Sequence, residues 1–249
     1  MTKVVFACLL VALSAAVGPA EARDPTPLSL QKGARIGIVN MMDAEVTHFH
    51  ASKVLAQSFF KTPPVAWQID SMLSDAVSPR LTQLGLVPVA TGATDSLMRS
   101  RDDTFVNSSV VKGLPKETAR QFAELATSNH LDALIVLAPG LNNSSQAGSA
   151  VRKSLPEYLR GWGFVTGDTN DKPSLFNMTQ LLLIGVSPEG ATLNAREWGG
   201  AYSADWVDYT PPPDLKQFPQ DQLDRLQPLF EKILSQQANR LMDWITVAR

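Results

Sequence analysis

Hydrophobic and polar positions along this 249-residue chain follow two periods, one typical of strands and one typical of helices. Short apolar runs rich in β-branched residues, bounded by polar or turn-forming residues, predict strands. These strands fall at residues 34–40, 46–51, 54–60, 86–90, 133–137, 161–166, 175–186 and 191–206. Apolar residues spaced three and four apart predict helices at 69–84, at 115–129 and from Pro228 to Ile245. The segment between the strand at 86–90 and the helix at 115–129 is predicted as a polar loop.

Prolines and glycines refine this pattern. Pro79 lies inside the first helical segment and predicts a kink or a break, whereas Gly85 is well placed to cap the end of that helix. Pro88 assigns its strand to an edge of the sheet, because proline has no N–H to donate to a second neighbour. Residues 133–137 are all apolar, as expected for a strand that is covered on both faces.

The order of these elements predicts the fold class α/β (α+β), with a mixed β-sheet, packed helices and a long C-terminal helix. With 44% hydrophobic residues, the chain can bury a core without disulfides. No internal repeat or long linker divides it, so we expect a single domain over residues 34–249. Residues 23–33 contain two prolines and little periodicity, which favours a flexible leader.

The first 22 residues have the pattern of a secretory signal peptide. Lys3 gives a basic start, residues 4–17 form an uncharged apolar run, and Ala20-Glu-Ala22 forms an A-x-A cleavage site. The apolar run is too short to anchor the chain in a bilayer. Cys8 lies within this run rather than after it, which argues against a lipid anchor. We therefore expect an exported protein, periplasmic or secreted, that is cleaved after Ala22 and has no transmembrane segment in its mature chain.

Composition and charge exclude several functions. Cys8 is the chain's single cysteine, so cleavage would leave no thiol for catalysis, disulfides or metal binding. An exported chain without cysteines is more typical of a Gram-negative periplasm than of a eukaryotic secretory pathway. The net charge of -2 and the absence of a basic cluster argue against nucleic acid as a partner.

His48 and His50 are candidate metal ligands. Two residues apart on a strand, they point to the same face, where two imidazoles can share a metal ion. Asp43 and Glu45 lie close by in sequence, and His130 is a more distant candidate. None of these has a diagnostic ligand spacing, so ordinary sheet histidines are the alternative interpretation, and we expect no cofactor.

An aromatic stripe is the second candidate site. On one extended strand, Trp198, Tyr202 and Trp206 face the same way, and Tyr209 follows them. Such a stripe can stack against a sugar or hold a peptide. The alternative is a face on which a helix packs, since small residues separate the rings.

Motifs for catalysis give little support to an enzyme. The sequence has no G-x-S-x-G motif, and Ser29-Leu-Gln-Lys32 matches S-x-x-K only in the leader, without the partner motifs of that active site. Residues 161–167 have one residue too many for G-x-G-x-x-G, and no helix follows. Carboxylates are scattered, so no pair is indicated as a general acid and base.

A larger pattern runs from Glu117 to Gly200. A helix ending in Leu125-Ala-Thr-Ser-Asn-His130 leads to Asp-Ala, an apolar run and Gly140, and residues 181–196 then form a two-strand meander. This order resembles a group of Gram-negative envelope domains, which includes the TolB amino-terminal domain, the curli-secretion lipoprotein and lipoprotein activators of penicillin-binding proteins. The chain departs from them because it has no lipidated cysteine and no propeller. The resemblance implies an α/β domain that acts through protein contacts.

We therefore expect a periplasmic, non-enzymatic accessory protein that binds an envelope protein. Its contact surface is expected at the Gly-, Asn- and Ser-rich loop 140–149 or at the corner 206–213, because loops on a rigid scaffold often carry recognition. Two alternatives stay open. One is a metal-binding protein or metal-dependent hydrolase that uses the His48 and His50 pair, and the other is a binder of a small ligand or glycan on the aromatic stripe. The sequence does not indicate an oligomeric state.

Overall fold

The structure is a computed structural model, and it describes residues 27–105, 113–140, 159–168, 173–199 and 209–248. Its strands are β1 (Leu28–Gln31), β2 (Arg35–Asn40), β3 (Thr47–Ala51), β4 (Phe59–Lys61), β5 (Val87–Ala90), β6 (Ala133–Pro139), β7 (Gly161–Gly167), β8 (Ser174–Ser187), β9 (Gly190–Trp198) and β10 (Ile245–Ala248). Its helices are α1 (Ile69–Gln83), α2 (Asp95–Phe105), α3 (Lys116–Ser128), α5 (Gln220–Asp224) and α6 (Gln227–Met242), with a short 3₁₀ turn at Leu55–Gln57.

Eight of the described strands form one mixed sheet in the order β4-β3-β7-β8-β6-β2-β5, with β9 paired to β8. β2 pairs in parallel with both β5 and β6, and β3 pairs in parallel with β7, whereas β8 is antiparallel to its neighbours β6, β7 and β9. The predicted α/β class and mixed sheet are confirmed. β5, which contains Pro88, lies at the edge of the sheet as expected.

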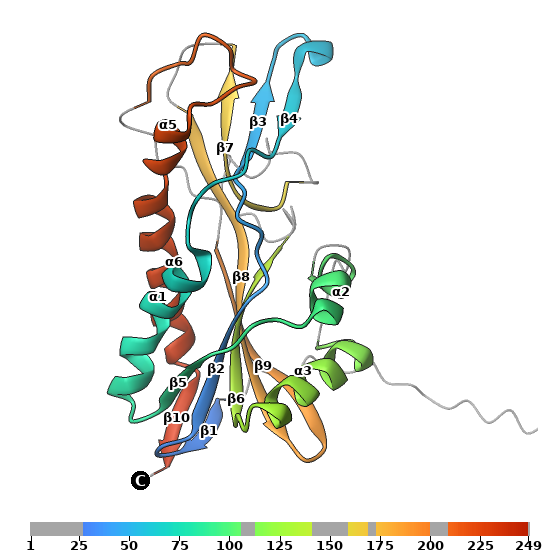
Figure 1. The fold of residues 1–249 in the computed structure, drawn as a ribbon, viewed down its shortest axis with the longest axis vertical. Coiled ribbons are helices and arrows are strands. Elements are labelled where there is room, and N and C mark those ends of the chain that lie inside the picture. Colours follow the sequence, from blue (N-terminus) through green and yellow to red (C-terminus); the bar gives the residue numbers. More distant parts are fainter. Residues whose placement is uncertain (1–26, 106–112, 141–158, 169–172, 200–208, 249) are drawn as a thin grey trace, which may run out of the picture.

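β8 joins the two halves of the sheet. Its first part pairs with β7 from Ser174 to Met178, and its second part pairs with β6 from Thr179 to Gly185. Figure 1 shows β8 running along the length of the molecule, with β3, β4 and β7 at one end and β2, β5, β6 and β9 at the other.

Helices cover both faces of the second half. α1 and α6 pack together on one face, and α2 and α3 lie on the other (Figure 1). The run at 133–137 explains this arrangement, because its side chains alternate between the two cores: Ile135 packs with α1 and α6, and Val136 packs with α2 and α3. Both are fully buried, which confirms the prediction of a strand covered on both faces.

The predicted helices form with small differences at their ends. α1 continues through Pro79 as one helix, so the proline does not split it. Gly85 takes a φ of 77°, and the Leu86 N–H donates to the Leu81 carbonyl at 3.0 Å, which is the expected glycine cap. The long C-terminal helix ends at Met242 rather than at Ile245.

The prediction of a flexible leader over residues 23–33 is wrong at residues 28–31. Those residues form β1, which pairs in parallel with β10 at the C-terminus. The physical reason is burial: Leu30 is 7% exposed and packs on the main core, so ordering these residues removes apolar surface from water. The packed chain therefore begins before residue 34.

Two further segments differ from the predictions. Residues 95–105 form α2, where the sequence predicts a polar loop, because Leu97 and Phe105 bury themselves against β6 and α3. β9 ends at Trp198, and the predicted continuation to residue 206 lies outside the described residues. Among the described residues, no helix has the length and apolar character needed to cross a membrane.

Candidate functional site

His48 and His50 lie on β3 and face the same side, as their spacing predicts. His48 Nε2 is 2.8 Å from Thr166 Oγ1, and His50 Nδ1 is 2.9 Å from the same oxygen. Thr166 comes from β7, directly opposite His50 in the parallel pair. All three residues are buried. The two imidazoles are therefore held by one hydroxyl group.

Asp168 extends this arrangement at the end of β7. Its Oδ1 lies 3.4 Å from His50 Nε2, and its Oδ2 accepts from the Lys53 N–H at 2.5 Å and from Ser52 Oγ at 3.1 Å. These hydrogen bonds, the Lys53 N–H first, hold the pKa of Asp168 below its usual value. A carboxylate only accepts, so the proton on His50 belongs on Nε2. We call Asp168, His50, Thr166 and His48 the histidine chain.

The proton on each member of the histidine chain follows from that assignment. His50 Nδ1 accepts from the Thr166 hydroxyl, and Thr166 Oγ1 accepts from the N–H of His48 Nε2. Burial, and to a smaller extent the nearby His50, lowers the pKa of His48 to about 3. Two aromatic rings enclose the His48 imidazole. The Phe164 ring stacks on it with the ring centroids 4.5 Å apart, and the Phe218 ring meets it edge to face with the centroids 4.8 Å apart. His48 is therefore a neutral imidazole at pH 7.

The other residues considered for a metal site lie elsewhere. His130 adopts a φ of 55° at the C-terminal cap of α3, and its carbonyl accepts from Arg35 Nε at 3.0 Å. α3 and β3 lie toward opposite ends of the molecule (Figure 1). Asp43 is bound to Arg101 instead. Among the described residues, no group of three or more His, Cys, Asp or Glu side chains is placed to hold a metal ion.

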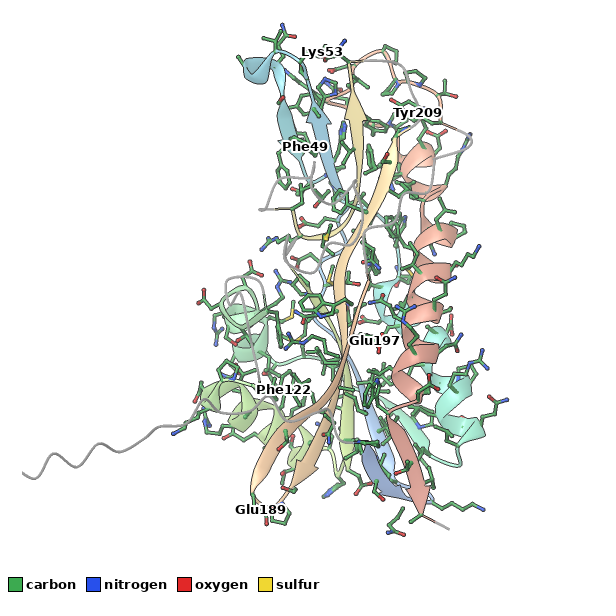
Figure 2. The ribbon with its side chains drawn as sticks, turned by 180° about the vertical axis from the view of Figure 1, so that it is seen from behind. Phe49, Lys53, Phe122, Glu189, Glu197 and Tyr209 are labelled. Atoms are coloured by element: carbon green, nitrogen blue, oxygen red, sulfur yellow. The ribbon has the colours of Figure 1, made fainter. Side chains whose placement is uncertain are left out.

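The aromatic stripe is described only at Trp198, because Tyr202 and Trp206 lie outside the described residues. Tyr209 is half-buried, burial raises its pKa, and its ring stacks on Phe218 at 6.2 Å. Figure 2 shows Tyr209 near the end of the molecule that carries β3, and shows Glu197, the neighbour of Trp198, about half-way along. Trp198 and Tyr209 therefore belong to different surfaces.

The parallel strands bring a further set of residues together. β2 lies between β5 and β6 in the sheet. The chain passes from β2 to β5 through α1 on one face, and from β5 to β6 through α2 and α3 on the other face. The strand order therefore reverses at β2. In open α/β sheets, ligands bind in the crevice at the carboxyl ends of the strands where the order reverses. Here those ends are Asn40 of β2 and Pro139 of β6.

Ion pairs line a small pocket at these carboxyl ends. Arg101 of α2 donates to the Met41 carbonyl at 2.9 Å, to Asp43 at 2.7 Å and to Asp102 at 3.1 Å. Burial alone would lower the pKa of Arg101, but Asp43 and Asp102 outweigh it and raise that pKa. Arg160 pairs with the other oxygen of Asp102. The donors of Arg101 are thus matched by acceptors from the chain itself.

Arg196 of β9, on the face covered by α2 and α3, is different. Its Nε and Nη2 are buried, and neither has a hydrogen-bond partner. Burial lowers the pKa of Arg196, and the guanidinium lies 5.3 Å from the centroid of the Trp198 ring. The Trp198 ring in turn lies against Gly140, where an added Cβ would come within 2.9 Å of it.

Gln180 adds a third unpaired atom at this place. It lies opposite Trp198 in the β8–β9 pair, diagonally across from Arg196. Its Nε2 donates to the Pro139 carbonyl at 2.8 Å and to the Phe105 carbonyl at 3.3 Å, whereas its buried Oε1 has no partner. We call Gln180, Arg196 and Trp198, with the ion pairs of Arg101, the carboxyl-end site.

The sequence analysis identified Trp198 but missed the rest of this site. Arg101 and Asp102 lie in a segment predicted as a polar loop. Two signals were usable: Arg196 is an arginine inside the predicted strand 191–206, and Gln180 is a polar residue inside the apolar run of β8.

The Thr166 hydroxyl and the S-x-x-K match are two arrangements among the described residues that resemble reactive sites. The Thr166 hydroxyl lies between two imidazoles, as an activated nucleophile would, but the residue is 4% exposed and its oxygen is already shared. Of the S-x-x-K match, Ser29 lies within β1 and Lys32 directly follows it, and β1 pairs with β10 away from both clusters. The carboxyl-end site holds charges and hydrogen-bonding atoms suited to recognition.

Comparisons of the chain with protein-family models, with curated proteins and with solved structures found no match. The resemblance to Gram-negative envelope domains therefore stays a prediction.

Proposed function

We propose that the protein is an exported, non-enzymatic binding protein of the bacterial cell envelope, and that it holds a partner protein at the carboxyl-end site. The signal-peptide pattern of residues 1–22 supports export. The reversal of strand order at β2 supports the location of the site. The unpaired guanidinium edge of Arg196 is the observation that carries the proposal.

A buried charge without a counter-charge is unfavourable. Leaving one member of a buried ion pair alone destabilises a protein by about 3 to 5 kcal/mol. Nε–H and one Nη2–H of a guanidinium point the same way and together match the two oxygens of a carboxylate. At Arg196 these are the two atoms without a partner. Both atoms are buried in the free protein, so a partner's carboxylate reaches them only when the surrounding chain moves, and it would then satisfy both atoms at once.

Gln180 narrows the chemistry of the partner. Its unpaired Oε1 accepts a hydrogen bond, so it suits an N–H next to the carboxylate. A polypeptide offers that combination at an Asp or Glu side chain and at its C-terminal residue. Trp198 provides an aromatic surface beside both groups. Arg101 has its hydrogen-bonding partners within the chain, so we assign it to the shape of the site rather than to recognition.

Export is tested first, by fractionating cells that express the full chain or a chain without residues 2–22. We expect the full chain in the periplasmic fraction, shortened at Ala22, and the truncated chain in the cytoplasm. Retention of the full chain in the cytoplasm would contradict export. The outcome is independent of the binding experiment.

Binding is tested by site-specific photo-crosslinking in cells, with a photoreactive amino acid at Ala44, an exposed residue next to Asp43, so that the Arg101–Asp43 ion pair stays intact. The same probe at Glu189, in the turn between β8 and β9 (Figure 2), is the control position. We expect a discrete product from Ala44 alone, reduced at least tenfold by Arg196→Gln and unchanged by Arg120→Gln, which removes an exposed arginine of α3. Equal products in wild type and Arg196→Gln would overturn the assignment.

A further inference from the structure

A second pocket lies at the other end of the molecule, next to the histidine chain. It has a volume of about 260 Å³ and lies between β3, the residues that follow β4 and the segment before α5. In Figure 1 these elements meet at the end of the sheet opposite β1 and β10. Six residues line it: His48, Lys61, Thr62, Pro63, Lys216 and Phe218.

The charges at this pocket are all of one sign. Lys61 and Lys216 come from segments far apart in the sequence, and both are exposed. No carboxylate lines the pocket, and no described carboxylate forms an ion pair with either lysine. Asp214, the nearest acid in sequence, accepts the backbone N–H of Lys216 at 2.9 Å. Two ammonium groups that share one hollow repel each other, and an anion between them relieves that repulsion.

Position and rigidity also favour a ligand here. The Lys216 ammonium lies 5.8 Å from the centroid of the Phe59 ring, which holds it over β4. His48 forms a wall that is 1% exposed, fixed by its hydrogen bond to Thr166 and by its contacts with Phe164 and Phe218. A pocket with fixed walls loses little conformational entropy when it binds.

We propose that this pocket binds a small oxyanion, the phosphate or carboxylate group of a ligand, between Lys61 and Lys216. The Thr62 hydroxyl, which also lines the pocket, can donate a further hydrogen bond. Phe218 and Pro63 supply apolar surface for the part of the ligand that bears the anion. This oxyanion pocket is separate from the carboxyl-end site, and the proposal does not depend on the proposed function.

Isothermal titration of the mature protein at low salt tests the proposal, with inorganic phosphate in one arm and benzoate in the other. We expect saturable binding of at least one probe, and the arm that binds more tightly identifies the oxyanion. The Lys61→Gln/Lys216→Gln double variant should bind that probe at least tenfold more weakly. The Lys32→Gln/Lys232→Gln double variant, which removes two exposed lysines away from the pocket, is the charge-matched control and should bind as wild type does.

The lysine variants change exposed side chains, so thermal unfolding curves should show that they fold as wild type does. Two results would overturn the proposal: wild type showing no saturable binding of either probe, or the double variant binding as tightly as wild type. Equal loss in the Lys32→Gln/Lys232→Gln control would also overturn it, because the effect would then follow from net charge alone.

Discussion

Acidification should destabilise the protein through His48. Burial lowers the pKa of His48 from its usual 6.5 to about 3 in the folded state, whereas the unfolded chain exposes the imidazole to water. The unfolded state therefore binds one more proton than the folded state between these two values. Stability attributable to His48 is complete above pH 6.5 and falls as the pH decreases toward 3.

The size of the effect follows from the two pKa values. At pH 7 the unfolded imidazole is mostly neutral, and at pH 5 it is almost fully protonated, while the folded His48 stays neutral at both. Linkage then gives a loss of about 2 kcal/mol in the free energy of unfolding between pH 7 and pH 5. The lowered pKa of Asp168 acts in the same direction at lower pH, and the raised pKa of Glu45, due mainly to burial, acts in the opposite direction.

Urea unfolding followed by tryptophan fluorescence at pH 7, 6 and 5 measures this loss. The His48→Gln variant keeps a hydrogen-bonding side chain without the titration, so its stability should fall by about 2 kcal/mol less than that of wild type over the same range. Equal losses in the two proteins would refute the reasoning. Should the variant not fold, the ring nitrogens of His48 in wild type can be observed by NMR, and a protonated ring at pH 5 would refute it as well.

Three further variants test how the fold is held together, each by urea unfolding. Thr166→Val leaves both imidazoles of the histidine chain without their shared partner and should lower the free energy of unfolding by about 2 to 4 kcal/mol, whereas Thr166→Ser should keep most of it. Leu30→Ala should lower the free energy of unfolding by about 2 to 4 kcal/mol, whereas the control Gln31→Ala, at an exposed position of β1, should lower it by less than about 0.5 kcal/mol. Equally small effects of the two changes would mean that β1 adds no stability. Gly163→Ala should cost about 1 to 3 kcal/mol, because its Cβ would lie 2.1 Å from a backbone oxygen of β3, whereas Gly92→Ala meets no atom within 4 Å.

Much of the fold could be predicted because its signals are local. The apolar run at 133–137, the glycine at the end of α1 and Pro88 at the sheet edge each act within a few residues, and each prediction is confirmed. The pairing of β1 with β10 joins residues more than two hundred positions apart, and no short window of sequence contains it. The glycines of β7 show the same limit: β7 pairs in regular register, and Gly163 is there because β3 passes too close for a side chain.

The candidate sites were predictable only in part, for the same reason. The spacing of His48 and His50 predicted a shared face, and the structure confirms that face. Their hydrogen-bond partner Thr166 lies more than a hundred residues away in the sequence. The spacing of the two histidines alone therefore could not distinguish a shared metal ion from a shared hydroxyl group. Arg196 and Gln180 become informative only when the structure shows which of their atoms lack partners.

The long strand β8 explains why the two proposed sites can be studied separately. At its centre, where pairing passes from β7 to β6, the buried Gln237 of α6 accepts from Asn177 and Thr179 at 3.3 and 3.4 Å and donates to the Glu197 carbonyl at 3.3 Å. This polar network fixes the middle of the sheet, with the oxyanion pocket beyond one end and the carboxyl-end site beside the other half. Substitutions far apart and without shared partners usually have additive effects. Arg196→Gln should therefore leave oxyanion binding intact, and the double lysine variant should leave cross-linking at Ala44 intact. A loss of both functions from either change would indicate unfolding of β8 rather than loss of a site.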